Sequence, residues 1–240
     1  MRNTTMAGAL ASIVFALAGI ALFILETTPP RLGFEDTDNP AVMVRFVQAY
    51  PDVFIYAGLA LILMAISLTA ATLAVGDAFA PRSNPLAVRC VSAFGLLAAA
   101  FFLLSAALHI GASGPLLHMA GLRAEWGEAA YLAFNVANQA SGIMGIFMLC
   151  AWAVGLSLIG LRTRVIPIAL CALGILPAIR LVTGVLGPLG LLPDSEFLWI
   201  IGMASIPGVM VWCLVLGLVL LRRGFGSEAE PRVAPATAGA

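Results

Sequence analysis

The sequence predicts an all-α membrane protein with six transmembrane helices and both termini in the cytoplasm. Of its 240 residues, 62% are hydrophobic and only 10% are charged, against about 45–50% and 25% in an average soluble domain. A membrane-spanning helix needs about 20 mostly apolar residues. Six segments meet this requirement: 6–25, 53–75, 86–110, 129–161, 165–185 and 198–221. The connections between these segments alternate between arginine-rich and acidic.

The first apolar segment follows Arg2 and superficially resembles a secretory signal. It is too long for the apolar region of a signal peptide, and no small-x-small cleavage site follows it. We therefore expect it to be retained as the first span.

The first connection contains a start signal for a helix. Asn39 is a favourable cap, and Pro40 suits the first helical position. Apolar residues then recur at helical spacing up to Pro51: Met43, Phe46, Val47 and Tyr50. This pattern predicts a short helix in the outer membrane interface. The alternative is a loop that packs on the end of the bundle.

The charges of the connections predict the orientation of the chain. One set of chain segments is basic: Arg2, Arg82, Arg89, Arg162, Arg164, Arg222 and Arg223. The other set is acidic: Glu35, Asp36, Asp38, Asp52, Glu125, Glu128, Asp194 and Glu196. Because arginine-rich loops stay in the cytoplasm, both termini are expected there, and six spans satisfy that parity.

The fourth segment contains polar residues in its outer half. Tyr131, Asn135 and Asn138 follow the spacing i, i+4, i+7 and are expected on one face of a helix, with Gln139 beside them. The amides could line a cavity, or they could form hydrogen bonds between helices, worth about 0.6 kcal/mol each.

The fifth segment contains one charge, Arg180. A charge at membrane depth costs roughly 2.5–3.5 kcal/mol on insertion scales and is a candidate for a functional site. Arg180 is expected within about two helical turns of the depth of the amides. The sequence therefore predicts an outward-facing polar cavity lined by Glu26, His109, Tyr131, Asn135, Asn138, Gln139 and Arg180. Alternatively, Arg180 extends to the headgroups, Glu26 merely ends a helix, and His109 is a packing residue.

Several chemistries find no support in the sequence. It contains no lysine, which excludes Schiff-base chemistry. The single cysteines Cys90, Cys150, Cys171 and Cys213 lack the pairing of redox or zinc sites and are expected to pack in the interior. The segment GASG at 111–114 is expected to end a helix. A serine-protease role would need a histidine on a later helix, and both histidines, His109 and His118, lie beside this segment. No metal site, cofactor, catalytic residue or nucleic-acid-binding surface is predicted.

Three stretches resemble the uncharacterised bacterial six-helix membrane proteins grouped as domain of unknown function 4386. They are NPAVMVRFVQAYPDVFIYAGLALILM, LIGLRTRVIPIALCALGIL and WCLVLGLVLLRRG. The resemblance implies a multi-pass protein of the bacterial inner membrane, and it brings no catalytic residues with it.

The sequence thus predicts one transmembrane domain over residues 1–223 and a disordered cytoplasmic tail over 224–240, which is small, polar and proline-bearing. Our first functional hypothesis is a non-enzymatic bundle in the lipid bilayer that binds or passes a small or lipid-like anionic ligand. A second is a membrane enzyme acting on a lipid, with His109 and Glu26 as acid and base. A third is a structural or partner subunit. The sequence does not determine the oligomeric state.

Overall fold

The computed structural model describes residues 2–186 and 196–226, and this part of the chain is helical without a strand. Its elements are α1 (Arg2–Glu26), α2 (Thr28–Arg31), α3 (Pro40–Ala49), α4 (Pro51–Phe79), the 3-10 turn η1 (Ala80–Arg82), α5 (Pro85–Leu122), α6 (Ala124–Thr163), α7 (Ile168–Ile175), α8 (Ala178–Leu186) and α9 (Glu196–Gly226). The all-α membrane class is confirmed. Within the described residues, five helices are long and apolar enough to cross a bilayer.

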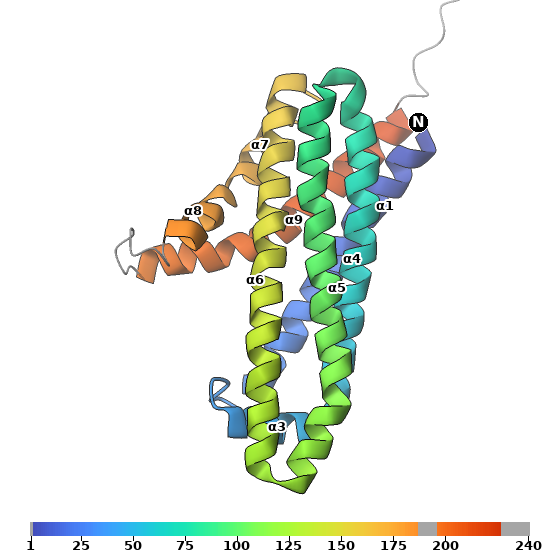
Figure 1. Ribbon diagram of the computed structural model, residues 1–240. Coiled ribbons are helices and arrows are strands. Elements are labelled where there is room, and N and C mark those ends of the chain that lie inside the picture. Colours follow the sequence, from blue (N-terminus) through green and yellow to red (C-terminus); the bar gives the residue numbers. More distant parts are fainter. Residues whose placement is uncertain (1, 187–195, 227–240) are drawn as a thin grey trace, which may run out of the picture.

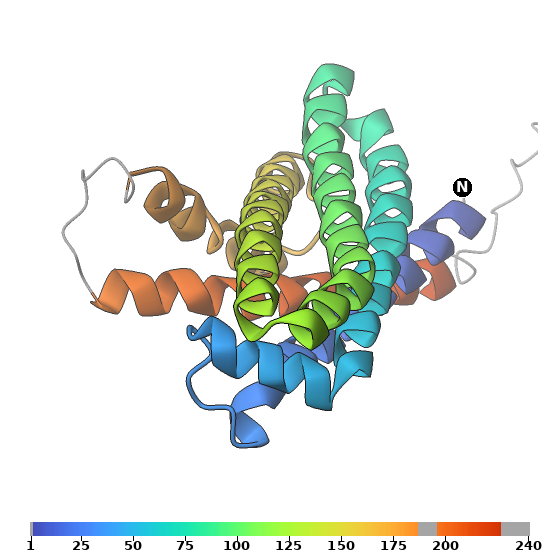
Figure 2. The same cartoon turned by 60° about the horizontal axis from the view of Figure 1, so that its bottom comes forward.

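The long helices form one bundle. Helices α4, α5 and α6 stand side by side, and α1 and α9 cross behind them (Figure 1). Helix α3 crosses the end of the bundle where the α5–α6 turn lies (Figure 2). The N-terminus, the α4–α5 turn and the α6–α7 turn lie at the opposite end (Figure 1). The arginine-rich turns thus gather at one end of the molecule.

Helices α5 and α6 are longer than the segments expected from hydropathy. They contain 38 and 40 residues, or about 57 and 60 Å at 1.5 Å per residue, against about 40–45 Å for a bilayer with its headgroups. The expectation that GASG ends a helix is wrong, because α5 continues through Gly111, Gly114 and Pro115 to Leu122. Packing explains the continuation, since Leu116 is buried against α3 and α6.

The segment 165–185, expected as a single span, consists of two short helices. Helix α7 ends at Ile175 and α8 begins at Ala178. Pro177 lies at the break, where it lacks the N–H that would continue the helical hydrogen bonds, and its ring clashes with the preceding turn. Helices α7 and α8 together contain the shorter apolar segment Ile168–Gly184. As a result α8 takes its own direction and leads away from α6 (Figure 1).

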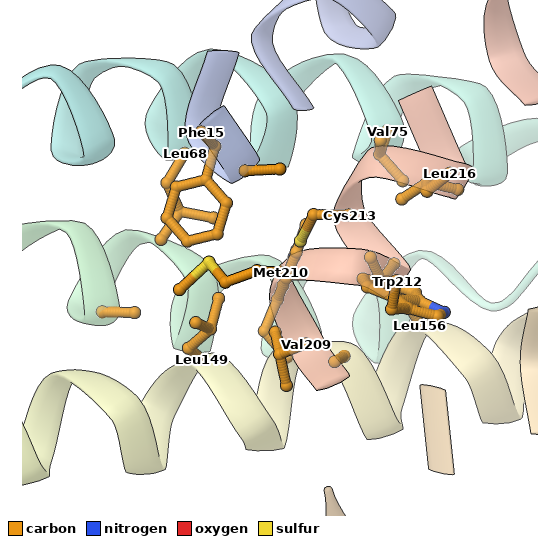
Figure 3. Close-up of a cluster of buried hydrophobic side chains, with 14 of the residues drawn as sticks. Phe15, Leu68, Val75, Leu149, Leu156, Val209, Met210, Trp212, Cys213 and Leu216 are labelled. Atoms are coloured by element: carbon orange, nitrogen blue, oxygen red, sulfur yellow. The ribbon is translucent and has the colours of Figure 1, made fainter. Parts of the chain in front are cut away.

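The main core lies where α1, α4, α5, α6 and α9 meet. Figure 3 shows its buried side chains, among them Phe15, Leu68, Leu156 and Met210. Near this core the rings of Trp152 and Trp212 meet edge to face, with centroids 5.6 Å apart.

A polar contact joins α9 to α7. The Trp212 indole N–H donates to the carbonyl of Leu170 at 3.0 Å. Three cysteines, Cys150, Cys171 and Cys213, are buried as expected, whereas Cys90 is exposed.

The helix expected after Asn39 is present as α3. Of the alternative, the loop is wrong, but the packing on the end of the bundle is observed. The Asn39 side chain accepts a hydrogen bond from the Ala41 N–H at 3.0 Å. The apolar side of α3 packs against the ends of α4, α5 and α6 in a second core made by Met43, Val44, Phe46, Val47, Phe54, Leu116, Tyr131 and Phe134. Its location in the membrane interface stays a prediction.

Two expectations fall partly or wholly outside the described residues. Asp194 in the fifth connection lies outside them. Of the expected tail, residues 224–226 continue α9, and residues 227–240 lie outside the described part.

Candidate functional site

The residues expected to line one cavity fall into separate places. Asn138, His109 and Tyr131 lie among α4, α5 and α6 beneath α3. With Ser105 they form what we call the buried polar cluster: Ser105, His109, Tyr131 and Asn138. Asn135 and Gln139 are half-buried and exposed, respectively. Together with Gly142 and Ile143 they form what we call the open face of α6: Asn135, Gln139, Gly142 and Ile143.

The angular spacing of a helix explains this separation. At 100° per residue, Asn138 lies about 20° from Tyr131 around α6 and both turn inward. Gln139 lies about 80° from Tyr131, so its side chain leaves the bundle. Asn135 lies between these directions, about 40° from Tyr131, and is half-buried.

Hydrogen bonds hold the buried polar cluster closed. The Ser105 hydroxyl on α5 donates to the side-chain oxygen of Asn138 on α6. The Nδ1 atom of His109 donates to the Ser105 carbonyl at 2.9 Å. The Ser141 hydroxyl donates to the Asn138 carbonyl at 2.9 Å. The Ser105 and Ser141 hydroxyls, the Asn138 side-chain oxygen and the His109 Nδ1 atom are therefore used within and between two helices.

Aromatic rings surround the imidazole of His109. Phe54 lies 5.6 Å from it between ring centroids, and Phe134 meets it edge to face at 5.3 Å. Tyr131 packs on Phe134 at 6.1 Å. His109 is only 7% exposed, which fits a packing role.

Glu26 does not join His109. It is the last residue of α1 and is exposed. Among the described residues no hydrogen bond connects the two side chains. An acid and base that act on one substrate must both reach it, and this pair shows no such arrangement.

Arg180 lies at the contact between α8 and α6. A Cβ on Gly184 would lie 3.7 Å from the ring of Phe147 on α6. Arg180 precedes Gly184 by one turn and therefore shares its face of α8. The Arg180 charge acts electrostatically on the Cys150 thiol, one turn further along α6. The half-buried guanidinium thus faces α6.

Among residues 6–184 and 204–222, whose side chains the structure describes, the Arg180 guanidinium has no ion pair. Its polar backbone neighbours are used locally: the Arg180 N–H bonds to the Pro177 carbonyl at 3.0 Å, and the Thr183 hydroxyl donates to the Arg180 carbonyl at 3.3 Å. The positive charge is therefore not neutralised by the described protein groups.

Arg180 is not at the depth of the buried polar cluster. Its neighbour Cys150 follows Asn138 by twelve residues, which is about 18 Å along α6. Counting residues from the ends of the segments misplaced Arg180, because the break at Pro177 gives α8 a direction of its own. Cys150 follows Gln139 by eleven residues, about three turns, so these two residues lie on the same side of α6.

The open face of α6 has room beside it. A Cβ on Gly142 would meet nothing within 4 Å. Ile143 is 51% exposed, and Val136 next to this face is 70% exposed. Beside this half of α6, α8 and the start of α9 have already diverged (Figure 1). The same side of α6 that is covered at Cys150 is thus uncovered at Gln139.

Two participants were missed from the sequence. Ser105 had a signal, since it precedes His109 by four residues and shares its face of α5. No sequence signal pointed to Gly142, because the open space beside it depends on the directions of α8 and α9. No three metal-binding side chains come together within residues 2–186 and 196–226.

One family model matches the chain. It is described as domain of unknown function (DUF4386) and covers residues 6–224. No curated protein and no solved structure matches.

Proposed function

This chain belongs to the family described as domain of unknown function (DUF4386), and from this premise we propose that it is a six-span membrane protein that binds or passes an anionic ligand, small or lipid-like, at Arg180. Helices α7 and α8 together make the fifth of the six spans, broken at Pro177. The protein acts as a binding bundle, without catalysing a reaction.

In the proposed orientation both termini lie in the cytoplasm and α3 lies in the outer interface. The exposed arginines Arg82, Arg89, Arg162 and Arg164 at one end of the bundle support this orientation, because arginine-rich loops stay inside. The acidic residues of the α1–α3 connection and of the first turns of α6 at the other end agree with it.

This orientation defines a depth for each site. With Arg89 and Arg162 at the inner headgroups, a hydrocarbon layer of about 30 Å ends about 20 residues later. These limits fall near His109 on α5 and Gly142 on α6. Asn135 and Gln139 then lie at the outer boundary, and Arg180, beside Cys150, lies near the middle of the bilayer.

The observation that carries the proposal is the unpaired charge of Arg180 against α6. A cation in the hydrocarbon region costs several kcal/mol unless an anion or water compensates it. Residues 6–184 and 204–222, whose side chains the structure describes, provide no acidic partner. An anionic ligand would provide one, and the half-buried Asn135 and exposed Gln139 amides toward the outer side would give it polar contacts on entry.

Direct binding measurements on the purified full-length protein test this proposal. The probes are phosphatidylglycerol and glycerol 3-phosphate, and the variants are Arg180→Gln and the control Arg162→Gln at the cytoplasmic turn. We expect at least one probe to bind the parent and the control, with binding to Arg180→Gln weakened about tenfold or more. Equal binding by Arg180→Gln, or no binding of either probe by the parent, would reject the proposal.

A further inference from the structure

We infer that the ligand is an anionic phospholipid that enters sideways from the outer leaflet along the open face of α6. This inference rests on the proposed function and adds the source of the anion and its route. The phosphate is drawn inward past Gly142 and Ile143 toward Arg180, while the acyl chains stay in the bilayer.

The first argument is the open space. A Cβ on Gly142 of α6 would meet no atom within 4 Å. By contrast, a Cβ on Gly145, one turn further inward on α6, would press on the Phe102 ring at 2.9 Å. The space beside α6 is therefore open at Gly142 and closed toward α5.

The second argument is that the exposed side chains around the open face of α6 are apolar. Val136 and Ile143 next to the polar side chains are largely exposed, as expected of residues that contact acyl chains. A soluble anion would have to cross this apolar surface to reach Arg180. The acyl chains of a phospholipid, by contrast, can pack against this apolar surface.

The third argument is the order of the polar groups. The exposed amide of Gln139 lies on the same side of α6 as Cys150, three turns further outward. Arg180 lies on the face of α8 that packs against α6 at Phe147, and its charge acts on the Cys150 thiol one turn away. A phosphate that leaves the outer headgroup layer thus meets an amide first and the guanidinium deeper, and a guanidinium binds phosphate oxygens well.

The test fills the open space. In Gly142→Leu a side chain occupies the face of α6. In the matched control Gly111→Leu, a leucine replaces another glycine with nothing within 4 Å of its Cβ, on α5. Binding of dioleoyl phosphatidylglycerol, dioleoyl phosphatidylcholine and glycerol 3-phosphate is measured for both variants and the parent.

We expect the parent and Gly111→Leu to bind phosphatidylglycerol in preference to phosphatidylcholine, and Gly142→Leu to lose affinity for it about tenfold. Unchanged binding by Gly142→Leu would overturn the route. If glycerol 3-phosphate binds as tightly and displaces phosphatidylglycerol, the lipid inference fails while anion binding at Arg180 stands. If no anion binds, or phosphatidylcholine binds equally, both proposals fail.

A second measurement keeps the inference testable if Gly142→Leu does not fold. The unmodified protein is reconstituted with phosphatidylglycerol that has a photoreactive acyl chain, and the labelled peptides are mapped. We expect labelling concentrated on residues 135–146 of α6. Labelling spread evenly over the exposed apolar residues of α1, α4 and α5 would overturn the inference.

Discussion

The Ser105 hydroxyl on α5 donates a hydrogen bond to the side-chain oxygen of Asn138 on α6. This bond joins the two longest helices at the level where α3 closes the end of the bundle. It assigns Asn138 to helix association, whereas Asn135 and Gln139 on the same helix stay accessible.

Breaking this bond should destabilise the bundle. We expect Ser105→Ala and Asn138→Leu each to lower the free energy of unfolding by about 0.6–1.7 kcal/mol, the range found for such bonds between membrane helices. A double-mutant cycle measured by unfolding in detergent isolates the coupling between them. Asn135→Leu is the control and should have little effect. A coupling indistinguishable from zero would show that the bond contributes nothing.

Gly174 on α7 should not tolerate a side chain. A Cβ there would press on the Ser157 hydroxyl and the Trp212 indole, so we expect Gly174→Ala to lower the free energy of unfolding by about 1–3 kcal/mol. Gly208→Ala, where the space is open, should be neutral or stabilising because alanine favours helix. Equal stabilities of the two variants would contradict the described packing of α6, α7 and α9.

The attachment of α3 depends on Phe46, which is 1% exposed. Replacing a buried phenylalanine by alanine typically costs about 3–5 kcal/mol. We expect Phe46→Ala to release α3 locally, measured as faster proteolysis of the 27–50 segment. Tyr50→Ala is the control, because Tyr50 is 41% exposed. Protection unchanged in Phe46→Ala would mean that α3 is held by other contacts.

Thiol labelling tests the proposed orientation. Cys90 is exposed near the start of α5, whereas the other three cysteines are buried. A membrane-impermeant maleimide should label Cys90 only after the membrane is opened. In a Cys90→Ser background, Thr37→Cys in the connection before α3 should be labelled from outside intact cells. The opposite labelling pattern would show that the topology is the reverse of the proposed one.

Much of this fold is predictable from the sequence because its causes are local. Long apolar runs specify the spans, and Asn39 followed by Pro40 specifies the start of α3. Local hydropathy does not predict that α5 continues past Gly111, since that continuation depends on Leu116 packing against α3 and α6.

The candidate site is only partly predictable from the sequence, because it depends on tertiary packing. The expected grouping of Arg180 with the amides assumed straight, parallel helices of known depth. The break at Pro177 and the rotation of Gln139 away from Tyr131 separate these residues. The uncovered side of α6 follows from the directions of α8 and α9, which arise from tertiary packing.

The most direct test of the central claim compares the unfolding of Arg180→Leu with that of the parent, in a neutral detergent and after addition of phosphatidylglycerol. Without the lipid, we expect the variant to be at least as stable as the parent, because an unpaired half-buried charge is removed. At a lipid concentration of about 100 Kd, the parent should gain about 2.7 kcal/mol and the variant far less, which reverses their order. If the lipid stabilises both proteins equally, Arg180 does not bind the anionic ligand.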